Sequence, residues 1–232
     1  MTKHADHYNR NLACPACGKK SRFKIWDRIY TDKVPELKDQ VRDLSLFHFV
    51  CPACGQETYL DYDFLYVQND VRLVIYYAPG GGDISAMHES LQKPEYAFMQ
   101  SYQYRLIRLP GTPIPISVRL ARLLETLAIF DAALDDRVLE IMKVMLRSWL
   151  AAQAEPIHAD LVEFTFAGGK KAFHFADTQK GNSGILPFEG GVEQTYKALA
   201  QDLEPLLAKE ETLTFNQEWA VSFVQQHQDL FA

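Results

Sequence analysis

This chain of 232 residues has few cysteines and no long uninterrupted apolar stretch. No run approaches the roughly 18 apolar residues that a membrane-spanning helix needs, so we expect no membrane partner. Residues 1–11 are polar and lack the apolar segment of a secretory signal. We therefore expect a cytoplasmic, reducing compartment, in which structural disulfides are disfavoured.

Familiar catalytic motifs are also missing. No serine or cysteine stands in a nucleophile elbow, and the seven histidines are scattered, with no pair at metal-ligand spacing. The glycine run at residues 80–82 fits neither phosphate-loop pattern, which favours a flexible connection over a phosphate site. An enzyme with a site between the two halves of the chain is thus a hypothesis without a motif.

The chain lacks the excess of basic charge that broad nucleic-acid binding requires. Its formal net charge is -6, and non-specific binding depends on neutralising phosphates. Net charge does not report its distribution, however. A small basic group lies beside the first cysteine pair and keeps a nucleic-acid-binding protein as an alternative: Lys19, Lys20, Arg22, Lys24 and Arg28.

What the chain does contain is enough apolar sequence for one large or two small domains, with 47% hydrophobic residues. Three prolines in residues 110–115 mark the best boundary between domains, which we place at 1–110 and 116–232. Residue patterns predict an α+β fold with a β-rich N-terminal half and an α+β C-terminal half. The expected strands cover residues 23–25, 46–50, 64–67, 72–77, 102–109, 162–166, 173–175 and 185–188. The expected helices cover 34–44, 83–91, 117–134, 136–152 and 192–203, the last kinked or ended near Pro205, and a final helix is capped by Asn216.

All four cysteines lie in two identical Cys-Pro-Ala-Cys-Gly words, at residues 14–18 and 51–55. Two thiols three residues apart can face one metal ion, and two such pairs complete a tetrahedral shell. Proline fixes one backbone angle of each word, and glycine after the second cysteine permits a left-handed backbone. The pattern predicts a structural metal site, with zinc as the expected ion, formed by Cys14, Cys17, Cys51 and Cys54. The predicted helix at 34–44 then accounts for the long spacing between the words as an insertion.

Three alternatives to a zinc site use the same four cysteines. A redox dithiol needs a low-pKa thiol at a helix N-terminus, whereas the flanks of both words resemble strands. Two structural disulfides conflict with the expected compartment. Iron uses the same four thiolates, so ligand type does not distinguish it from zinc. A closed shell of four cysteines leaves no position for water or substrate, which favours a structural role.

The sequence resembles the CpXC family, which is named for two Cys-Pro-x-Cys words. The similarity is good over residues 8–110 and looser beyond. It rests on both cysteine words and on these segments: Trp26-Asp27, Pro35-Glu36-Leu37-Lys38, Leu46-Phe47-His48-Phe49-Val50, Phe64-Leu65-Tyr66, Asp131-Ala132-Ala133-Leu134-Asp135-Asp136-Arg137 and Gly181-Asn182-Ser183-Gly184. The resemblance implies metal binding by the four cysteines and implies no activity.

Other candidate residues have simpler structural explanations. An acidic cluster at a helix junction could bind a divalent cation, but capping and ion pairing with Arg137 are favoured: Asp131, Asp135, Asp136 and Glu140. His48 could assist the metal, but an ordinary sheet histidine is favoured because four cysteines fill the shell. Aromatic residues of the N-terminal half could stack on bases, although core packing is favoured: Trp26, Tyr59, Tyr62, Tyr66, Tyr76 and Tyr77.

The leading hypothesis from the sequence is therefore a zinc-ribbon protein that binds or scaffolds an unidentified protein partner, with no catalysis at the metal. The N-terminal domain would carry the ribbon with its helical insertion. The C-terminal α+β domain would pack on it or on a partner.

Overall fold

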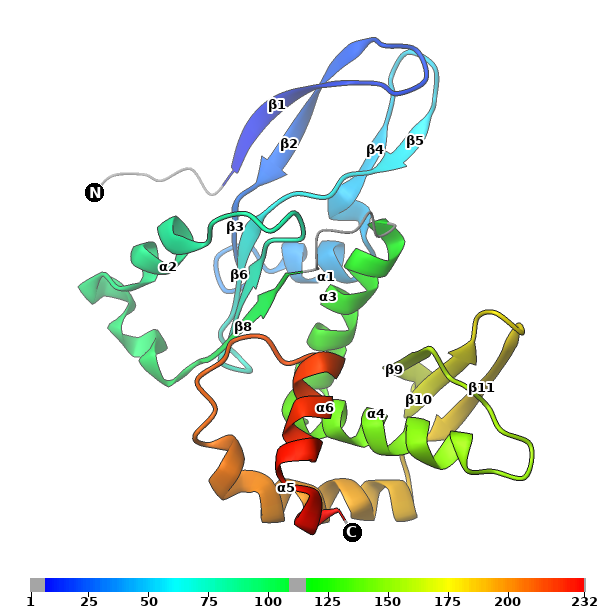
Figure 1. Cartoon of the computed structure of the whole chain (residues 1–232). Coiled ribbons are helices and arrows are strands. Elements are labelled where there is room, and N and C mark those ends of the chain that lie inside the picture. The colour runs from blue at the N-terminus through cyan, green and yellow to red at the C-terminus, as the bar shows by residue number, and fades with distance from the viewer. Residues whose placement is uncertain (1–6, 109–115, 232) are drawn as a thin grey trace. The chain divides into compact units, whose positions relative to one another are not determined.

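The computed structural model describes residues 7–108 and 116–231 and forms two compact units, Met1–Leu124 and Glu125–Ala232 (Figure 1). It contains both helices and sheets, which confirms the predicted α+β class. Helix α3 (Ile116–Asp131) contributes residues to both units. The proline-rich boundary at 110–115 lies outside the described residues, so the domain limits 1–110 and 116–232 stay predictions.

The cysteine-bearing part of the first unit consists of two antiparallel hairpins. Strand β1 (His7–Ala13) pairs with β2 (Lys20–Trp26), and β4 (His48–Val50) pairs with β5 (Glu57–Tyr59). Each hairpin is a separate two-stranded sheet, and both are visible in Figure 1. Two-stranded sheets are marginally stable alone, so both hairpins need a further source of stability.

A mixed four-stranded sheet forms the core of the first unit. Its strands are β3 (Arg28–Tyr30), β6 (Phe64–Gln68), β7 (Leu73–Tyr77) and β8 (Gln103–Ile107), in the order β3-β6-β7-β8. The predicted hairpin of β6 and β7 is confirmed, with Phe64 opposite Tyr77. Every residue of both strands is buried, as expected for strands covered on two faces.

Helix α1 (Glu36–Arg42) packs on this sheet and confirms the helix predicted at 34–44. Leu37 and Val41 are buried, and Arg42 at its end donates hydrogen bonds to the Tyr66 hydroxyl and the Gln68 side-chain oxygen. These bonds satisfy two polar groups that are fully buried in the sheet. The same unit contains helix α2 (Ser85–Leu91) and the 3-10 helix η2 (Pro94–Ser101).

Two N-terminal segments differ from expectation. Strand β1 was not predicted, because its sequence His-Tyr-Asn-Arg-Asn-Leu-Ala lacks the apolar alternation of a half-buried strand. The strand expected at 46–50 is shorter, since Ser45–Phe47 form the 3-10 helix η1. Leu46 and Phe47 are both buried, and consecutive strand residues would point to opposite faces.

The second unit packs helices against a three-stranded sheet. Helices α4 (Asp136–Ala151), α5 (Gly191–Leu207) and α6 (Gln217–Gln226) accompany strands β9 (Leu161–Ala167), β10 (Lys170–Asp177) and β11 (Asn182–Pro187) in the order β11-β10-β9. The chain closes with the 3-10 helix η3 (Gln228–Leu230). Helix α4 contacts α5, α6 and β9, which confirms a helix packed on more than one side. Helix α5 continues through Pro205 to Leu207, so it does not end at the proline.

Candidate metal centre

Each Cys-Pro-Ala-Cys-Gly word forms the tip of one hairpin. In the first, the Cys14 N–H donates to the Lys19 carbonyl over 3.0 Å, and the Gly18 N–H donates to the Cys14 carbonyl over 2.9 Å. The second repeats both bonds: Cys51 to Gln56 and Gly55 to Cys51, each 2.9 Å. Both glycines have φ near +70°, at +71° and +73°, which explains why glycine occupies this position.

The two tips bring all four sulfur atoms together. The Sγ atoms of Cys14 and Cys54 lie 3.7 Å apart, as do those of Cys17 and Cys51, and all four lie within 4.8 Å of one another. A tetrahedral zinc ion with Zn–S bonds of about 2.3 Å requires sulfur–sulfur distances of about 3.8 Å. The cluster therefore has the dimensions of a tetrathiolate metal site.

The four thiols differ in their exposure to solvent. Cys14 and Cys51, the first cysteine of each word, are buried, whereas Cys17 and Cys54 are exposed. Cys14 and Cys51 pack on Phe49, whose ring meets that of Phe23 edge-on at 6.0 Å. This small apolar layer closes the inner side of the cluster and leaves the outer side open to ions from solvent.

All four cysteines are free thiols, and their position argues against a redox dithiol. The words connect β1 to β2 and β4 to β5, so neither lies at the N-terminus of a helix, where reactive dithiols gain their low pKa. In each 3.7 Å pair the two sulfurs come from different words. The arrangement favours joint binding of one ion by both hairpins.

The electrostatics of the thiols show why the cluster suits a cation. The Ala53 N–H lowers the pKa of Cys51 to about 6, since it stabilises a thiolate there. At Cys54 the Gln56 N–H also acts to lower the pKa, but the Cys17 thiol and burial outweigh it and raise the pKa to about 12. Without a cation, charge on one sulfur therefore opposes charge on the next.

Fold and site together define an α+β protein with a four-cysteine cluster of the metal-binding kind. A family model described as "CpXC protein" matches residues 12–143. This match covers more than half of the chain, so the protein belongs to the CpXC family, as the resemblance predicted. No curated protein and no solved structure matches the chain.

The acidic helix junction serves as a cap, as favoured from the sequence. The Asp135 carboxylate accepts the Arg137 backbone N–H at 2.9 Å and pairs with the Arg137 guanidinium at 2.6 Å. Glu140 is buried and pairs with Lys143 at 2.7 Å. In the described part of the chain these carboxylates form no group that could hold a metal ion.

Three other candidates also behave as ordinary structural residues. The His48 ring lies 3.2 Å from the Glu57 carboxylate and packs on Tyr59 within the second hairpin, so it belongs to the sheet. The glycine run at 80–82 follows strand β7 and leads to α2, which makes it a connection. Tyr66, Tyr76 and Tyr77 are fully buried in the central sheet, which confirms the core interpretation for them.

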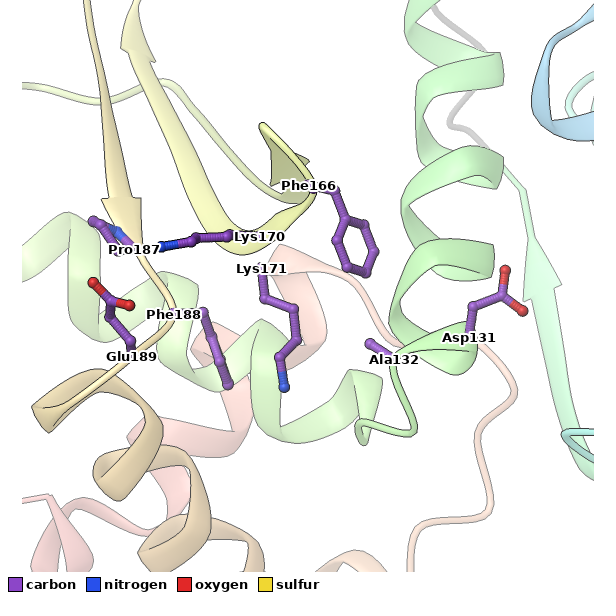
Figure 2. A pocket seen from close by; sticks show the side chains of 9 residues that line it. Asp131, Ala132, Phe166, Lys170, Lys171, Pro187, Phe188 and Glu189 are labelled. Atoms are coloured by element: carbon purple, nitrogen blue, oxygen red, sulfur yellow. The ribbon is translucent and has the colours of Figure 1, made fainter.

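A cavity of about 450 Å³ in the second unit was not predicted from the sequence. Phe166, Lys171 and Phe188 line it, and Lys171 Nζ lies 5.4 Å from the centre of the Phe188 ring. Figure 2 shows the Asp131 carboxylate directed away from Lys171. The labelled residues include no serine, cysteine or histidine, so this cavity contains no nucleophile–base pair of a familiar kind.

No helix among the described residues has the length and apolar character needed to cross a bilayer.

The sequence identified the basic residues of β2 but not their neighbours on β1, because β1 lacks the apolar alternation of a half-buried strand. Register pairs His7 with Trp26, Asn9 with Lys24 and Asn11 with Arg22. A knuckle with glycine after its second cysteine is itself a hairpin tip, and this signal would have predicted a strand before Cys14.

Proposed function

We propose that Cys14, Cys17, Cys51 and Cys54 bind one structural zinc ion and that the two hairpins form a zinc ribbon. The observation that carries this proposal is the match between the 3.7 Å sulfur pairs and the edge of a zinc tetrahedron, about 3.8 Å. The equivalent hydrogen bonds of the two knuckles support it, because both words present their thiols in the same way.

The ion would be structural because four protein thiolates complete its coordination shell. No position is left for a water molecule or a substrate, so the metal supplies cross-linking and no reaction step. The two hairpins need such a link. Their apolar layer is small, with Phe49, Cys14 and Cys51 as its buried members. Metal binding would supply the free energy that this layer lacks.

The role of the ribbon is to present a rigid binding surface to a partner in a reducing compartment such as the cytoplasm. Thiolate ligands persist where disulfides are not formed, which supports this placement. The hairpins expose large side chains that a ribbon would hold in fixed positions, among them Tyr8, Val50 and Tyr59. A binding or scaffolding module therefore suits the site better than a catalyst does.

Metal analysis tests the proposal directly. The full chain, purified without chelator, is expected to contain one zinc per molecule and no colour from iron. Each single variant, Cys17→Ser or Cys54→Ser, replaces an exposed ligand and should lower the metal content sharply, because the three remaining thiolates do not complete the shell. Ala16→Ser and Ala53→Ser change the same two words without removing a ligand and should retain the zinc. A folded, metal-free protein, or an iron protein, would contradict the proposal.

A further inference from the structure

The outward face of the β1–β2 hairpin carries a stripe of cations. Along β2, Lys20, Arg22 and Lys24 are exposed, whereas Ile25 on the other face is buried. Side chains two residues apart on a strand share a face and lie about 6.8 Å apart. The three cations therefore form a straight row beside the metal knuckle. Polar and aromatic side chains complete this outward face: His7, Asn9, Asn11 and Trp26.

This row lies in a positively charged segment of a chain whose overall net charge is negative. Residues 7–30 contain six lysines and arginines and one aspartate, whereas the whole chain has a net charge of -6. A zinc ion with four thiolates would add -2 at the tip and leave the segment positive. Among the described residues, no carboxylate pairs with Lys20, Arg22 or Lys24. The cations are therefore available to an external anion.

An aromatic ring ends the row of cations. The Trp26 ring lies 4.6 Å from the His7 ring, centre to centre, and the Lys24 amine lies 4.1 Å from the Trp26 ring centre. Asn9 and Asn11 lie across the strand from Lys24 and Arg22. Their amides both donate and accept hydrogen bonds. The face thus combines regularly spaced cations, amides and a half-buried aromatic ring.

The second hairpin has no such face. Residues 45–59 contain no lysine or arginine, and Glu57 lies opposite Val50. The basic character therefore belongs to one of two hairpins that share the same knuckle geometry. A metal site alone does not require it, which indicates a separate role for the face.

We propose that this outward face binds a single strand of nucleic acid, with phosphates along Lys20, Arg22 and Lys24 and a base stacked on Trp26. Single strands are bound by cationic grooves that follow the backbone and by aromatic rings that stack on bases. An acidic peptide would also meet the cations but would gain nothing from the aromatic ring. The proposal rests on the proposed function, because the zinc knuckle holds this hairpin in its folded form.

The test is fluorescence anisotropy of labelled oligothymidylate and oligouridylate with the zinc-loaded full chain. Each phosphate contact to a single strand lowers the slope of log affinity against log salt by about 0.7. Three contacts predict a slope of about -2, which is an affinity loss of about 20-fold between 50 and 200 mM salt. The combined variant Lys20→Gln, Arg22→Gln and Lys24→Gln should lose this salt dependence.

Three further variants test this interpretation. Lys93→Gln, Lys170→Gln and Lys209→Gln together change the net charge equally at exposed sites elsewhere and should bind as the wild type does. Trp26→Ala should weaken binding about 5- to 150-fold, the range of base stacking on an aromatic ring, whereas Trp26→Phe should keep most of the affinity. Metal content measured on every variant shows that the hairpin is intact.

Three results would overturn the proposal: no binding by the zinc-loaded chain, a salt slope unchanged in the stripe variant, or equal competition by polyglutamate. The last would assign the face to an acidic protein partner. Failure here is separable from failure of the zinc proposal. A chain that contains zinc and ignores oligonucleotides overturns only this inference, whereas a folded metal-free chain that binds them overturns only the zinc assignment.

Discussion

The cysteine hairpins and the second unit are stabilised in opposite ways. The apolar cluster beneath the two cysteine words has three buried members, Cys14, Phe49 and Cys51, and two of these are proposed metal ligands. The second unit instead has one extended apolar core, in which the rings of Phe164, Phe173 and Phe188 contact one another. A segment with little core depends on a cross-link, whereas one with a full core tolerates buried charge.

The buried charge of the second unit shows how far this tolerance extends. Lys143 on α4 is 2% exposed and forms ion pairs with Glu140 and with Glu125 of α3. The Glu125 carboxylate also accepts the Phe164 N–H at 2.6 Å, which joins α3 to β9. Burial of ions is costly unless every group has a partner. In the proposed ribbon, the hairpins would instead hold their four thiolates in fixed geometry around one metal ion.

Loss of the metal should have the largest effect, because it should unfold the cysteine hairpins and leave the second unit folded. We expect Cys51→Ser to abolish zinc binding and to unfold both hairpins, because apparent zinc binding free energies of about 10–16 kcal/mol exceed what so small a layer provides. Hydrogen exchange measured by mass spectrometry should show loss of protection in residues 7–26 and 48–59. Amides of β9 and β10 should keep theirs.

The variant Ala53→Ser, in the same word, is the control for this experiment and should leave exchange unchanged. Chelation of the wild-type protein should reproduce the pattern of Cys51→Ser. If the hairpins kept full protection after the zinc was removed, the contrast between a cross-linked segment and a core-stabilised one would not hold.

Removal of the buried Lys143 amine should have the next largest effect, and this effect should fall on the stability of the second unit. Lys143→Met leaves two glutamates buried without their shared cation, which costs about 3–5 kcal/mol when one partner of a buried pair is removed. Chemical denaturation followed by tryptophan fluorescence, to which Trp149 and Trp219 of the second unit contribute, measures this loss. Zinc content should be unaffected.

The exposed pair of Lys197 and Glu193 provides the matched control. Both lysines lie on helices of the second unit, and exposed pairs contribute about 0–1 kcal/mol. Lys197→Met should therefore change stability by no more than this. Equal effects of the two variants would show that the buried network does not carry the stability assigned to it.

Local sequence patterns predicted most of the elements. A β-prone aromatic run interrupted by turn-forming residues predicted the hairpin of β6 and β7, and alternating residues around two glycines predicted the hairpin of β9 and β10. Asp135 and Asn216 predicted the starts of α4 and α6, and both cap as expected. The two cysteine words predicted the cluster, because a thiol pair in a knuckle has few other geometries.

What local patterns did not predict depends on contacts between distant segments. Strand β1 has no apolar alternation: Leu12 packs on the small cluster under the knuckle, whereas Tyr8 and Arg10 on the same face are exposed. The pairing of Lys143 with Glu125 joins two helices, and nothing in either helix alone predicts it. The parallel pairing of β3 with β6 likewise spans more than 30 residues and leaves no local signal.

The smallest expected effect concerns a surface ion pair of the first unit, which neither a metal nor a core supports. Lys38 and Asp70 lie 2.7 Å apart. Burial acts to raise the pKa of Asp70, but hydrogen bonds from the Lys38 and Gln68 side chains outweigh it, so the pKa is lowered. A lowered folded pKa means that the contribution is present above the unfolded value of about 3.9 and is lost as the pH falls through the folded value.

The combined variants Lys38→Met and Asp70→Asn should therefore give a coupling of about 0.2–1 kcal/mol that is equal at pH 7 and pH 5. High salt should reduce it, because exposed charges are screened. In an NMR titration, Lys38→Met should move the midpoint of Asp70 upward, and Lys93→Met, at an exposed lysine of the same unit, should not. A coupling that survived high salt would place this pair with the buried network of the second unit, because buried charges are screened less. A coupling that vanished by pH 5 would contradict the lowered pKa of Asp70.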